Sequence, residues 1–297
     1  MNVRQRRDLI ALVAVLALVV LLAFLSTRGT HSDSLSPITG DKVGLVEVNG
    51  LLWDTQEWVE QIDDFRRDGR IKAIVVRLES PGGGVAASQE LYESLKRARD
   101  VKPVIASMGG IATSGAYYAA LGADSIVANP GTTTGSIGVM MEFPEWGVLM
   151  DKIGVTSRVI KSGPYKDSGN PSREMSDEER KVFQGYIDDA FDQFTDAVAQ
   201  ERGMTPAAVR KVADGRVYTG RQALKLGLVD RLGDLNEAVR LAAELGDVSG
   251  EPQIERPYRR GDLYWLERML DKAISRTVSR VENRSLFQYR WKAERAR

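Results

Sequence analysis

The chain has 297 residues, which is enough for one large domain or two small ones with a buried core. Its 41 Lys and Arg residues are balanced by 41 Asp and Glu residues, so its charge gives no reason to expect a nucleic-acid partner. It contains no cysteine, which excludes a thiol nucleophile, a disulfide bond and a zinc–thiolate site.

The N-terminal residues predict a membrane anchor. Arginines within residues 1–8 precede an almost purely aliphatic run over residues 9–25, a length near the lower limit for a helix that spans a bilayer. The basic flank predicts that residues 1–8 stay in the cytoplasm and that the rest of the chain is exported. A cleavable signal peptide is the alternative, but no clear small-x-small cleavage site follows the run, so we expect an uncleaved single-pass anchor. Residues 26–41 are expected to form a polar linker.

Residues 42–246 alternate short β-rich runs with helical periodicity, which is typical of an α/β domain. Strands are expected at residues 43–48, 73–78, 103–106, 125–128 and 157–160. Helices are expected at residues 55–68, 85–99, 114–121, 176–201, 206–212, 221–226 and 235–245. Ser176 and the three acidic residues after it indicate the start of the longest helix.

Residues 247–297 form a basic C-terminal tail that is expected to be in part an amphipathic helix, with apolar side chains at helical spacing. One interpretation is that this helix packs on its own domain or on a neighbouring subunit. The other is a basic surface helix that contacts anionic lipid. The sequence leaves both interpretations open.

A glycine run, Gly82-Gly83-Gly84, follows Glu79-Ser80-Pro81 between a predicted strand and a predicted helix. Glycines in such a place let the backbone approach a ligand and expose N–H groups, which suits phosphate binding or an oxyanion hole. The spacing from Gly82 to Ala87 also satisfies a loose dinucleotide fingerprint, but that pattern recurs by chance and leaves the serine motif described next without a role. A tight turn without a chemical function is the structural alternative.

Ser114 lies in a second glycine-rich motif, Gly109-Gly110-Ile-Ala-Thr-Ser114-Gly115-Ala-Tyr-Tyr118. It is expected at the start of a helix, whose dipole favours negative charge nearby, and Gly115 offers an unhindered N–H beside it. The motif is not a Gly-x-Ser-x-Gly nucleophile elbow, because alanines occupy positions 112 and 116. Taken alone, such a serine is more often a plain helix N-cap, so the motif gains weight from what accompanies it.

A lysine is the leading candidate for a general base, since the only histidine, His31, lies far upstream in a polar stretch. The run Lys161-Ser-Gly-Pro-Tyr-Lys166-Asp167 follows the last predicted strand. A neutral lysine requires its pKa to fall from about 10.4 toward 7, which costs about 4 kcal/mol and which burial in an apolar pocket supplies. The hydroxyl of Ser136 is suited to hold the amine. Spacing alone does not choose between Lys161 and Lys166, and either is otherwise a solvated loop charge.

At these motifs the chain resembles the signal peptide peptidase A family in its short bacterial form, a family of membrane-anchored Ser/Lys peptidases. The matching stretches are residues 80–83, 112–118, 134–139, 161–167, 214–220 and 227–230. The likeness covers about residues 42–245 and the anchor. It implies a Clp-protease/crotonase-like α/β fold with repeated ββα units and an N-terminal transmembrane helix.

The resemblance also implies residue roles. Ser114 looks like the nucleophile, and Lys166 rather than Lys161 looks like the general base. Ser136 is similar to the hydroxyl that orients this lysine in the family.

The resemblance assigns the oxyanion hole to the N–H groups of Gly83 and Gly115. Two residues nearby depart from the family's pattern. Glu79 stands where the family frequently has Asn, and Thr113 stands where it frequently has Ala. The departure at Glu79 concerns the fine positioning of the glycine-rich loop and not the reaction mechanism.

The resemblance further implies an ATP-independent endopeptidase that cleaves remnant signal peptides through an acyl-enzyme, without a cofactor or metal ion. It implies a homo-oligomeric ring in which Lys166 reaches Ser114 of an adjacent chain. Two other functions stay open. One is a crotonase-like acyl-thioester enzyme, against which the anchor argues because acyl-CoA is a cytosolic substrate, and the other is a non-catalytic membrane scaffold.

Overall fold

The computed structural model describes residues 41–257. The expected anchor, nearly all of the expected linker and residues 258–297 of the tail lie outside the described residues and stay predictions. Among residues 41–257, no helix is long and apolar enough to cross a membrane.

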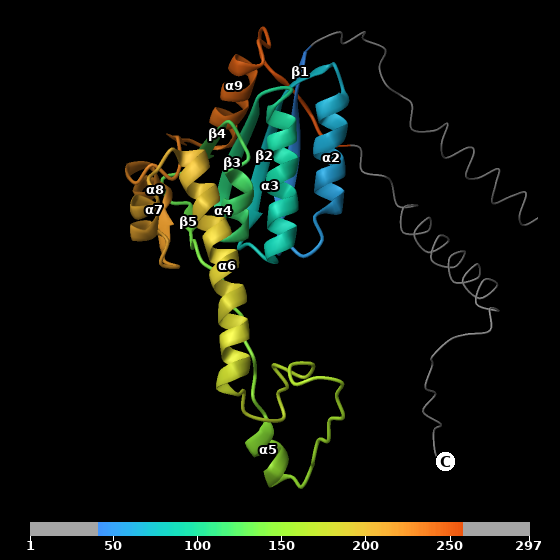
Figure 1. Cartoon of the computed structure of the whole chain (residues 1–297). Helices are drawn as coiled ribbons and strands as arrows, with labels where there is room; N and C mark the ends of the chain where they lie inside the picture. The colour runs from blue at the N-terminus through green and yellow to red at the C-terminus, as the bar shows by residue number, and fades with distance from the viewer. Residues whose placement is uncertain (1–40, 258–297) are drawn as a thin grey trace, which may run out of the picture. The chain divides into compact units, whose positions relative to one another are not determined.

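The described residues form an α/β domain around an eight-stranded sheet (Figure 1). The strands are β1 (Lys42–Asn49), β2 (Ile71–Ser80), β3 (Val104–Thr113), β4 (Ser125–Ala128), β5 (Thr133–Gly135), β6 (Val217–Thr219), β7 (Arg231–Leu232) and β8 (Gln253–Glu255). Their order is β6-β5-β3-β2-β1-β8, and β4 and β7 extend the sheet beside the first half of β3. The paired strands are parallel except for β5 and β6.

Helices cover both faces of this sheet. They are α2 (Gln56–Arg67), α3 (Val85–Arg99), α4 (Gly115–Ala120), α5 (Gly147–Lys152), α6 (Asp177–Arg202), α7 (Pro206–Val212), α8 (Gly220–Lys225) and α9 (Leu235–Leu245). Helices α2, α3, α4 and the C-terminal half of α6 contribute to the core on one face, and α9 packs on the other face. Alternate residues of β2 supply the two cores, since Ile74 and Val76 belong to the first and Ala73 and Val75 to the second. Burial on both faces explains why the central strands are nearly continuous apolar runs.

Helix α6 packs on the core along its C-terminal half and projects beyond the sheet along its N-terminal half (Figure 1). Near its C-terminal end, Glu201 accepts hydrogen bonds from Tyr92 (2.6 Å) and Arg99 (2.9 Å) of α3. Near its start, a capping box joins Ser176 to Glu179, as the acidic first turn predicted. We call residues 140–176, which include α5 and lie at the projecting end of α6, the arm.

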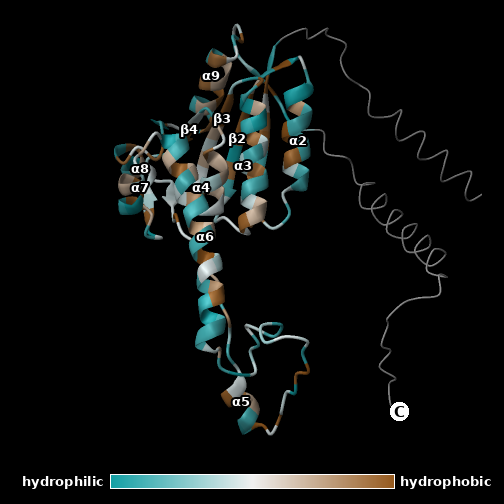
Figure 2. Ribbon diagram, in the orientation of Figure 1, coloured by the Kyte–Doolittle hydropathy of each residue, from teal (hydrophilic) through white to brown (hydrophobic). Residues whose placement is uncertain are grey.

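The arm exposes many large apolar side chains. These are Met140, Met141, Phe143, Trp146, Val148, Leu149, Ile153, Val155, Val159, Ile160 and Tyr165. The ribbon of the arm includes several brown stretches in Figure 2, which mark hydrophobic residues. So dense an apolar set on one segment is typical of a surface that binds another protein chain.

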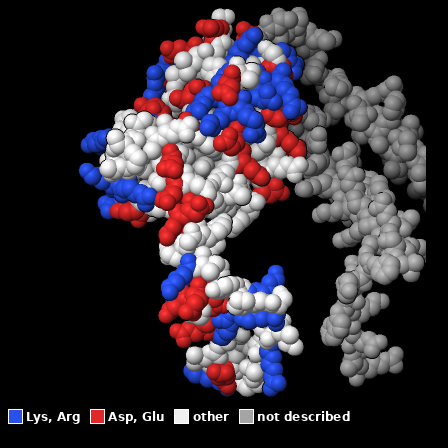
Figure 3. Space-filling model, viewed as in Figure 1, with Lys and Arg blue, Asp and Glu red and all other residues white. Residues whose placement is uncertain are grey.

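Basic side chains gather near the ends of α2 and α3 (Figure 3). The last turns of these helices carry Arg66, Arg67, Lys96, Arg97 and Arg99. Cations are favourable there because the C-terminal end of a helix carries partial negative charge. Some also pair with carboxylates, as Arg66 does with Asp63 at 2.9 Å. The cluster therefore has a structural explanation within the fold.

The expected α/β class is confirmed, together with the expected helices and four of the expected strands. The strand expected at residues 157–160 is wrong. These residues lie in the arm, are exposed and have no regular structure. Within residues 41–257, their β-branched pattern has no neighbouring strand to pair with, and a strand is stable only when its backbone groups find such partners.

Other differences concern short or interrupted elements. The strand expected to end at residue 106 continues to Thr113 as β3, although Gly109 and Gly110 interrupt its apolar pattern. Neither α5 nor the strands β5 to β8 follow from the sequence pattern, because strands of two or three residues and a helix of six are too short to show a periodicity. Among these short strands, β5 pairs with β3, β7 with β4 and β8 with β1, each a longer strand, and β6 pairs with β5.

Candidate active site

Ser114 occupies the sharp turn between β3 and α4. Its backbone angles, φ 52° and ψ −121°, lie outside the regions that non-glycine residues usually adopt. Its N–H donates to the Gly135 carbonyl (2.8 Å), and its carbonyl accepts from the Tyr118 N–H (2.9 Å). Its side chain makes no capping hydrogen bond to α4, so the plain N-cap interpretation lacks support. Backbone strain at a half-buried serine is a feature that clusters at active sites.

Helix α4 gives this turn a rigid base, because all of its residues are buried. The hydroxyl of the fully buried Tyr117 donates to the Leu228 carbonyl (2.9 Å), and burial raises the pKa of Tyr117. Tyr118 packs edge-on against Tyr92, with ring centroids 5.2 Å apart. The strained turn therefore has little freedom to relax.

Residues 80–84, which we call the glycine loop, connect β2 to α3. Leu52 holds this loop through two backbone hydrogen bonds. The Leu52 N–H donates to the Gly82 carbonyl (3.0 Å), and the Gly84 N–H donates to the Leu52 carbonyl (2.8 Å). Gly83 lies between these two bonds, so its own N–H is left to point elsewhere.

The glycine loop lies directly against the Ser114 turn. Gly82 has φ 101°, and a methyl group on its Cα would lie 2.7 Å from the Gly115 nitrogen. A methyl group on the Cα of Gly115 would lie 3.3 Å from the Gly83 nitrogen and 2.1 Å from Ser88 Oγ. Only glycine permits so close an approach at both positions.

Two backbone donors therefore lie side by side next to the serine. Among residues 41–257, neither the Gly83 N–H nor the Gly115 N–H donates a hydrogen bond. An oxyanion hole requires a pair of such donors beside the nucleophile. The arrangement is suited to acyl transfer, in which a hydroxyl attacks a carbonyl and negative charge develops on its oxygen.

Ser136 is brought to the same end of the sheet. It follows β5, whose last residue, Gly135, accepts the Ser114 N–H. Ser136 also has a positive φ, of 51°, and its N–H donates to the Arg216 carbonyl (2.8 Å). The structure thus gathers the backbones of Gly83, Ser114, Gly115 and Ser136 from three connections of the fold.

Lys166 is not part of this gathering within one chain. It is exposed and lies in the arm, in the connection between α5 and α6, which Figure 1 shows beyond the end of the sheet. Among the described residues, its side chain makes no hydrogen bond or ion pair, whereas nearby Lys161 makes both.

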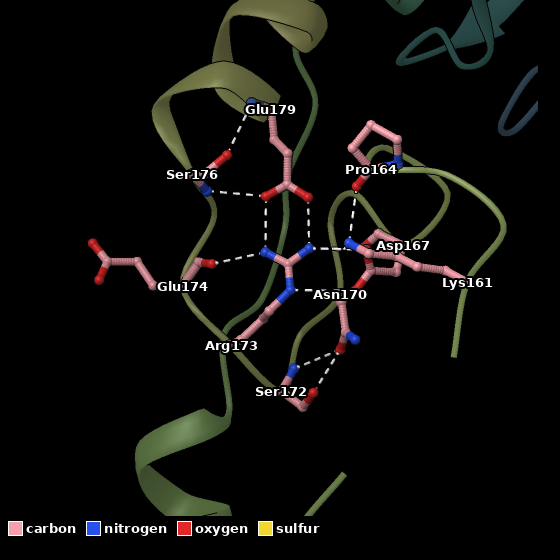
Figure 4. A network of polar contacts seen from close by, with 9 residues as sticks. All are labelled: Lys161, Pro164, Asp167, Asn170, Ser172, Arg173, Glu174, Ser176 and Glu179. Carbon is pink, nitrogen blue, oxygen red and sulfur yellow. Dashed lines mark hydrogen bonds and ion pairs between the residues drawn. The ribbon is translucent and has the colours of Figure 1, made fainter. Parts of the chain in front are cut away.

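A polar network fixes the part of the arm around Lys166 (Figure 4). Lys161 pairs with the carboxylate of Asp167, which also pairs with Arg173 (3.1 Å). Arg173 in turn contacts Glu179 at the start of α6 through both guanidinium nitrogens, one of them at 2.8 Å. The network ties the loop of the arm to the first turn of α6.

This network distinguishes the two lysines that spacing could not separate. The hydrogen bond from Lys161 lowers the pKa of Asp167, and the hydrogen bonds from Arg173 lower the pKa of Glu179 to about 2. Lys161 therefore forms an ion pair with the carboxylate of Asp167. Lys166 is exposed and makes no such contact among the described residues.

Sequence reasoning missed several residues whose side chains bind the backbone segments that form the site. Ser88 Oγ donates to the Gly84 carbonyl (2.8 Å), and Thr134 Oγ1 donates to the Ala112 carbonyl (2.8 Å). These hydroxyls come from separate elements and form no motif, so only the folded chain identifies them. Among residues 41–257, no group of three or more His, Asp or Glu side chains is placed to hold a metal ion.

Comparison with known proteins adds independent information. Residues 96–249 match the family model described as peptidase family S49. The chain is 43% identical over 208 residues to a putative protease of Synechocystis sp., covering 70% of this chain and 75% of that protein. It is 35% identical to a putative signal peptide peptidase SppA of Enterococcus faecium, covering 67% and 62%. It is 36% identical to the chloroplastic serine protease SPPA of Arabidopsis thaliana, covering 69% and 30%.

The fold and the serine site thus define a serine peptidase with an α/β domain. The chain belongs to peptidase family S49, among the relatives of signal peptide peptidase A. The mixed sheet of residues 41–257 is consistent with the Clp-protease-like domain expected from the resemblance. The chain spans only part of the length of its longer relatives.

The substitution Gly115→Ala is expected to lower peptidase activity by about a hundredfold, because displacing one donor of an oxyanion hole costs that much. The added methyl group would meet Ser88 Oγ at 2.1 Å. Gly131→Ala is the matched control, since no atom lies within 4 Å of a methyl group added there. Cleavage of an apolar peptide and thermal unfolding would be measured for each assembled variant. Full activity of a folded Gly115→Ala protein would contradict the assignment.

The arm network predicts a loss of order at low pH. Arg173 depresses the pKa of Glu179 from 4.5 to about 2, so this pairing stabilises the arm fully above pH 4.5 and is lost as the pH falls toward 2. Amide hydrogen exchange over residues 161–179 should therefore quicken across that window beyond its intrinsic pH dependence. Glu179→Gln should show the quickened exchange already at neutral pH.

Glu174→Gln is the control for this experiment, because the Glu174 carboxylate points away from the network in Figure 4. If amide exchange over residues 161–179 is equally slow in Glu179→Gln and in Glu174→Gln at neutral pH, the network does not order the arm.

Proposed function

We propose that this chain is a membrane-anchored, ATP-independent serine endopeptidase that degrades remnant signal peptides with a Ser114–Lys166 dyad. The observation that carries the proposal is the strained turn at Ser114, with the hydrogen-bond donors of Gly83 and Gly115 side by side next to it. Strain of this kind clusters at active sites, and a serine beside two backbone donors that have no partner among residues 41–257 is suited to acyl transfer.

In the proposed reaction, Ser114 Oγ attacks the carbonyl carbon of the scissile peptide bond and passes its proton to the neutral amine of Lys166. The Gly83 and Gly115 N–H groups donate hydrogen bonds to the oxygen that becomes negatively charged. When the C–N bond breaks, Lys166 returns the proton to the leaving amine and an ester remains on Ser114. Water, deprotonated by the same lysine, then hydrolyses the ester and restores the serine.

Lys166 reaches Ser114 from a neighbouring copy in a homo-oligomeric ring. Three features of the arm support this part of the proposal. Its apolar side chains are exposed in the single chain, Lys166 extends into solvent, and the network through Asp167 and Arg173 fixes the loop without engaging Lys166. The hydroxyl of Ser136 orients the lysine once the copies assemble.

The membrane location and the substrates rest on different support. The aliphatic run over residues 9–25 and its basic flank favour an anchor that leaves the peptidase domain outside the cytoplasm. Relatives named for signal peptide cleavage favour membrane-derived apolar peptides as substrates. Such a peptide binds in extended form along the backbone of the glycine loop.

The dyad is tested by mixing inactive variants. Ser114→Ala and Lys166→Ala should each abolish cleavage of a signal-peptide remnant by the detergent-solubilised oligomer, while Lys161→Ala should retain much of it. In an equal mixture of Ser114→Ala and Lys166→Ala subunits, about a quarter of the sites should hold both intact groups if the lysine acts on the adjacent chain.

The mixture has two informative outcomes. Recovery of cleavage supports a site shared between chains, and no recovery places the lysine on the same chain as its serine. Undiminished cleavage by unmixed Ser114→Ala would remove the serine peptidase assignment and favour a scaffold or a thioester enzyme.

The pH profile tests the identity of the base. A lysine base is active only when neutral, so the rate should rise with pH as the lysine loses its proton. Initial rates would be measured in the assembled state, with labelling of Ser114 by a serine-directed probe followed in parallel. A flat profile between about pH 6 and 9 would count against lysine.

A further inference from the structure

The strands on which the site is built are joined by an unusual bulge. In the pairing of β2 with β3, Leu78 lies opposite Met108, but Ser80 lies opposite Ala112. One residue of β2, Glu79, therefore faces the three residues 109–111 of β3. Because β3 has two more residues than β2 in this interval, every later residue of β2 pairs two positions farther along β3 than it otherwise would.

The side chain of Glu79 fills this bulge. Its carboxylate accepts hydrogen bonds from the Gly110 N–H (2.8 Å) and the Ile111 N–H (3.1 Å). A methyl group on the Cα of Gly109 would lie 1.8 Å from Glu79 Oε2, so the carboxylate sits directly on the glycine backbone. The half-buried acid thus replaces the strand partners that the bulged N–H groups have lost.

The other edge of β3 is held as well. Thr132 Oγ1 donates to the Gly109 carbonyl (2.6 Å), and Thr134 Oγ1 donates to the Ala112 carbonyl (2.8 Å). Both hydroxyls are buried. The bulge is therefore clamped between Glu79 on the β2 side and two threonines on the β5 side.

The register set by the bulge decides how the glycine loop meets the Ser114 turn. Directly after the Ser80 and Ala112 pair, the Thr113 hydroxyl donates to the Pro81 carbonyl (3.0 Å). The next residues bring the backbone of Gly82 against Gly115. If β3 shifted its register relative to β2, the Gly115 N–H would move away from the Gly83 N–H by much of the spacing between neighbouring residues.

We propose that Glu79 is a positioning residue, whose carboxylate holds the β3 bulge and so sets the register at which the Gly83 and Gly115 N–H groups converge beside Ser114. Glu79 does not touch the substrate. The inference deepens the proposed function and rests on it for its catalytic consequence.

The test compares Glu79→Ala, Glu79→Gln and Arg77→Met in the assembled full-length protein. Arg77 lies two residues earlier on the same face of β2 and donates to Ser107 Oγ (2.9 Å) and the Met108 carbonyl (3.2 Å). Arg77→Met therefore also removes two hydrogen bonds between β2 and β3, but outside the bulge. It controls for a loss of stability alone.

Glu79→Ala should lower kcat by about tenfold or more and leave KM within about twofold, because a displaced oxyanion hole weakens binding of the transition state more than that of the substrate. Glu79→Gln keeps one acceptor oxygen and should retain an intermediate kcat. Arg77→Met should keep the kcat of the wild type. A fall in kcat no larger for Glu79→Ala than for Arg77→Met would overturn the proposal.

Amide hydrogen exchange gives a second readout that does not need activity. Exchange should quicken at residues 109–111 and in the glycine loop of Glu79→Ala, and the glycine loop of Arg77→Met should match the wild type. If the wild-type protein cleaves no peptide, the proposed function fails. In that case, quickened exchange in the glycine loop of Glu79→Ala still supports the register role, and unchanged exchange overturns it.

Discussion

The candidate site depends on one backbone contact, the approach of the glycine loop to the turn at Ser114. The two peptide segments lie so close that a methyl group on Gly82 would collide with the Gly115 nitrogen, and one on Gly115 would collide with Ser88 of α3. The contact leaves two N–H groups without partners among the described residues. Gly115 is buried, and an unpaired N–H is costly there unless a ligand accepts from it, whereas Gly83 is exposed. The buried helix α4 and the hydrogen bonds from Leu52 hold the two segments in place.

The groups proposed to act in catalysis lie on two parts of the molecule, the covered sheet and the projecting arm. Ser114 and the two donors stand on a sheet that is covered on both faces, so their geometry is fixed by the core. Lys166 stands on the arm, at the far end of a 26-residue helix that is about 39 Å long at 1.5 Å per residue. The network of Arg173 and Glu179 fixes the loop to that helix, and Glu201 fixes the other end of the helix to the core. The position of the lysine is thereby set relative to the whole domain.

The elements that were predicted correctly are those whose signal is local. Helices α3 and α6 were recognised from apolar spacing and, for α6, from the capping box at Ser176, both of which act within a few residues. The prediction of a strand at residues 157–160 is wrong because β-branched residues also suit an exposed segment, and no strand of the described part of the chain lies beside it. The second half of β3 was missed because its glycines look like a break, although a carboxylate from β2 supports them.

By itself, the sequence determined the α/β class, the order of the main elements and the motifs around Gly83, Ser114, Ser136 and Lys166, since these depend on residue type and short spacing. Only the tertiary structure decided which groups meet. It separated Lys161 from Lys166 by giving one of them a carboxylate partner, and it gave Glu79 its two hydrogen bonds. The physical reason is that strand register and loop contacts join residues tens of positions apart, and no local pattern encodes which of them become neighbours.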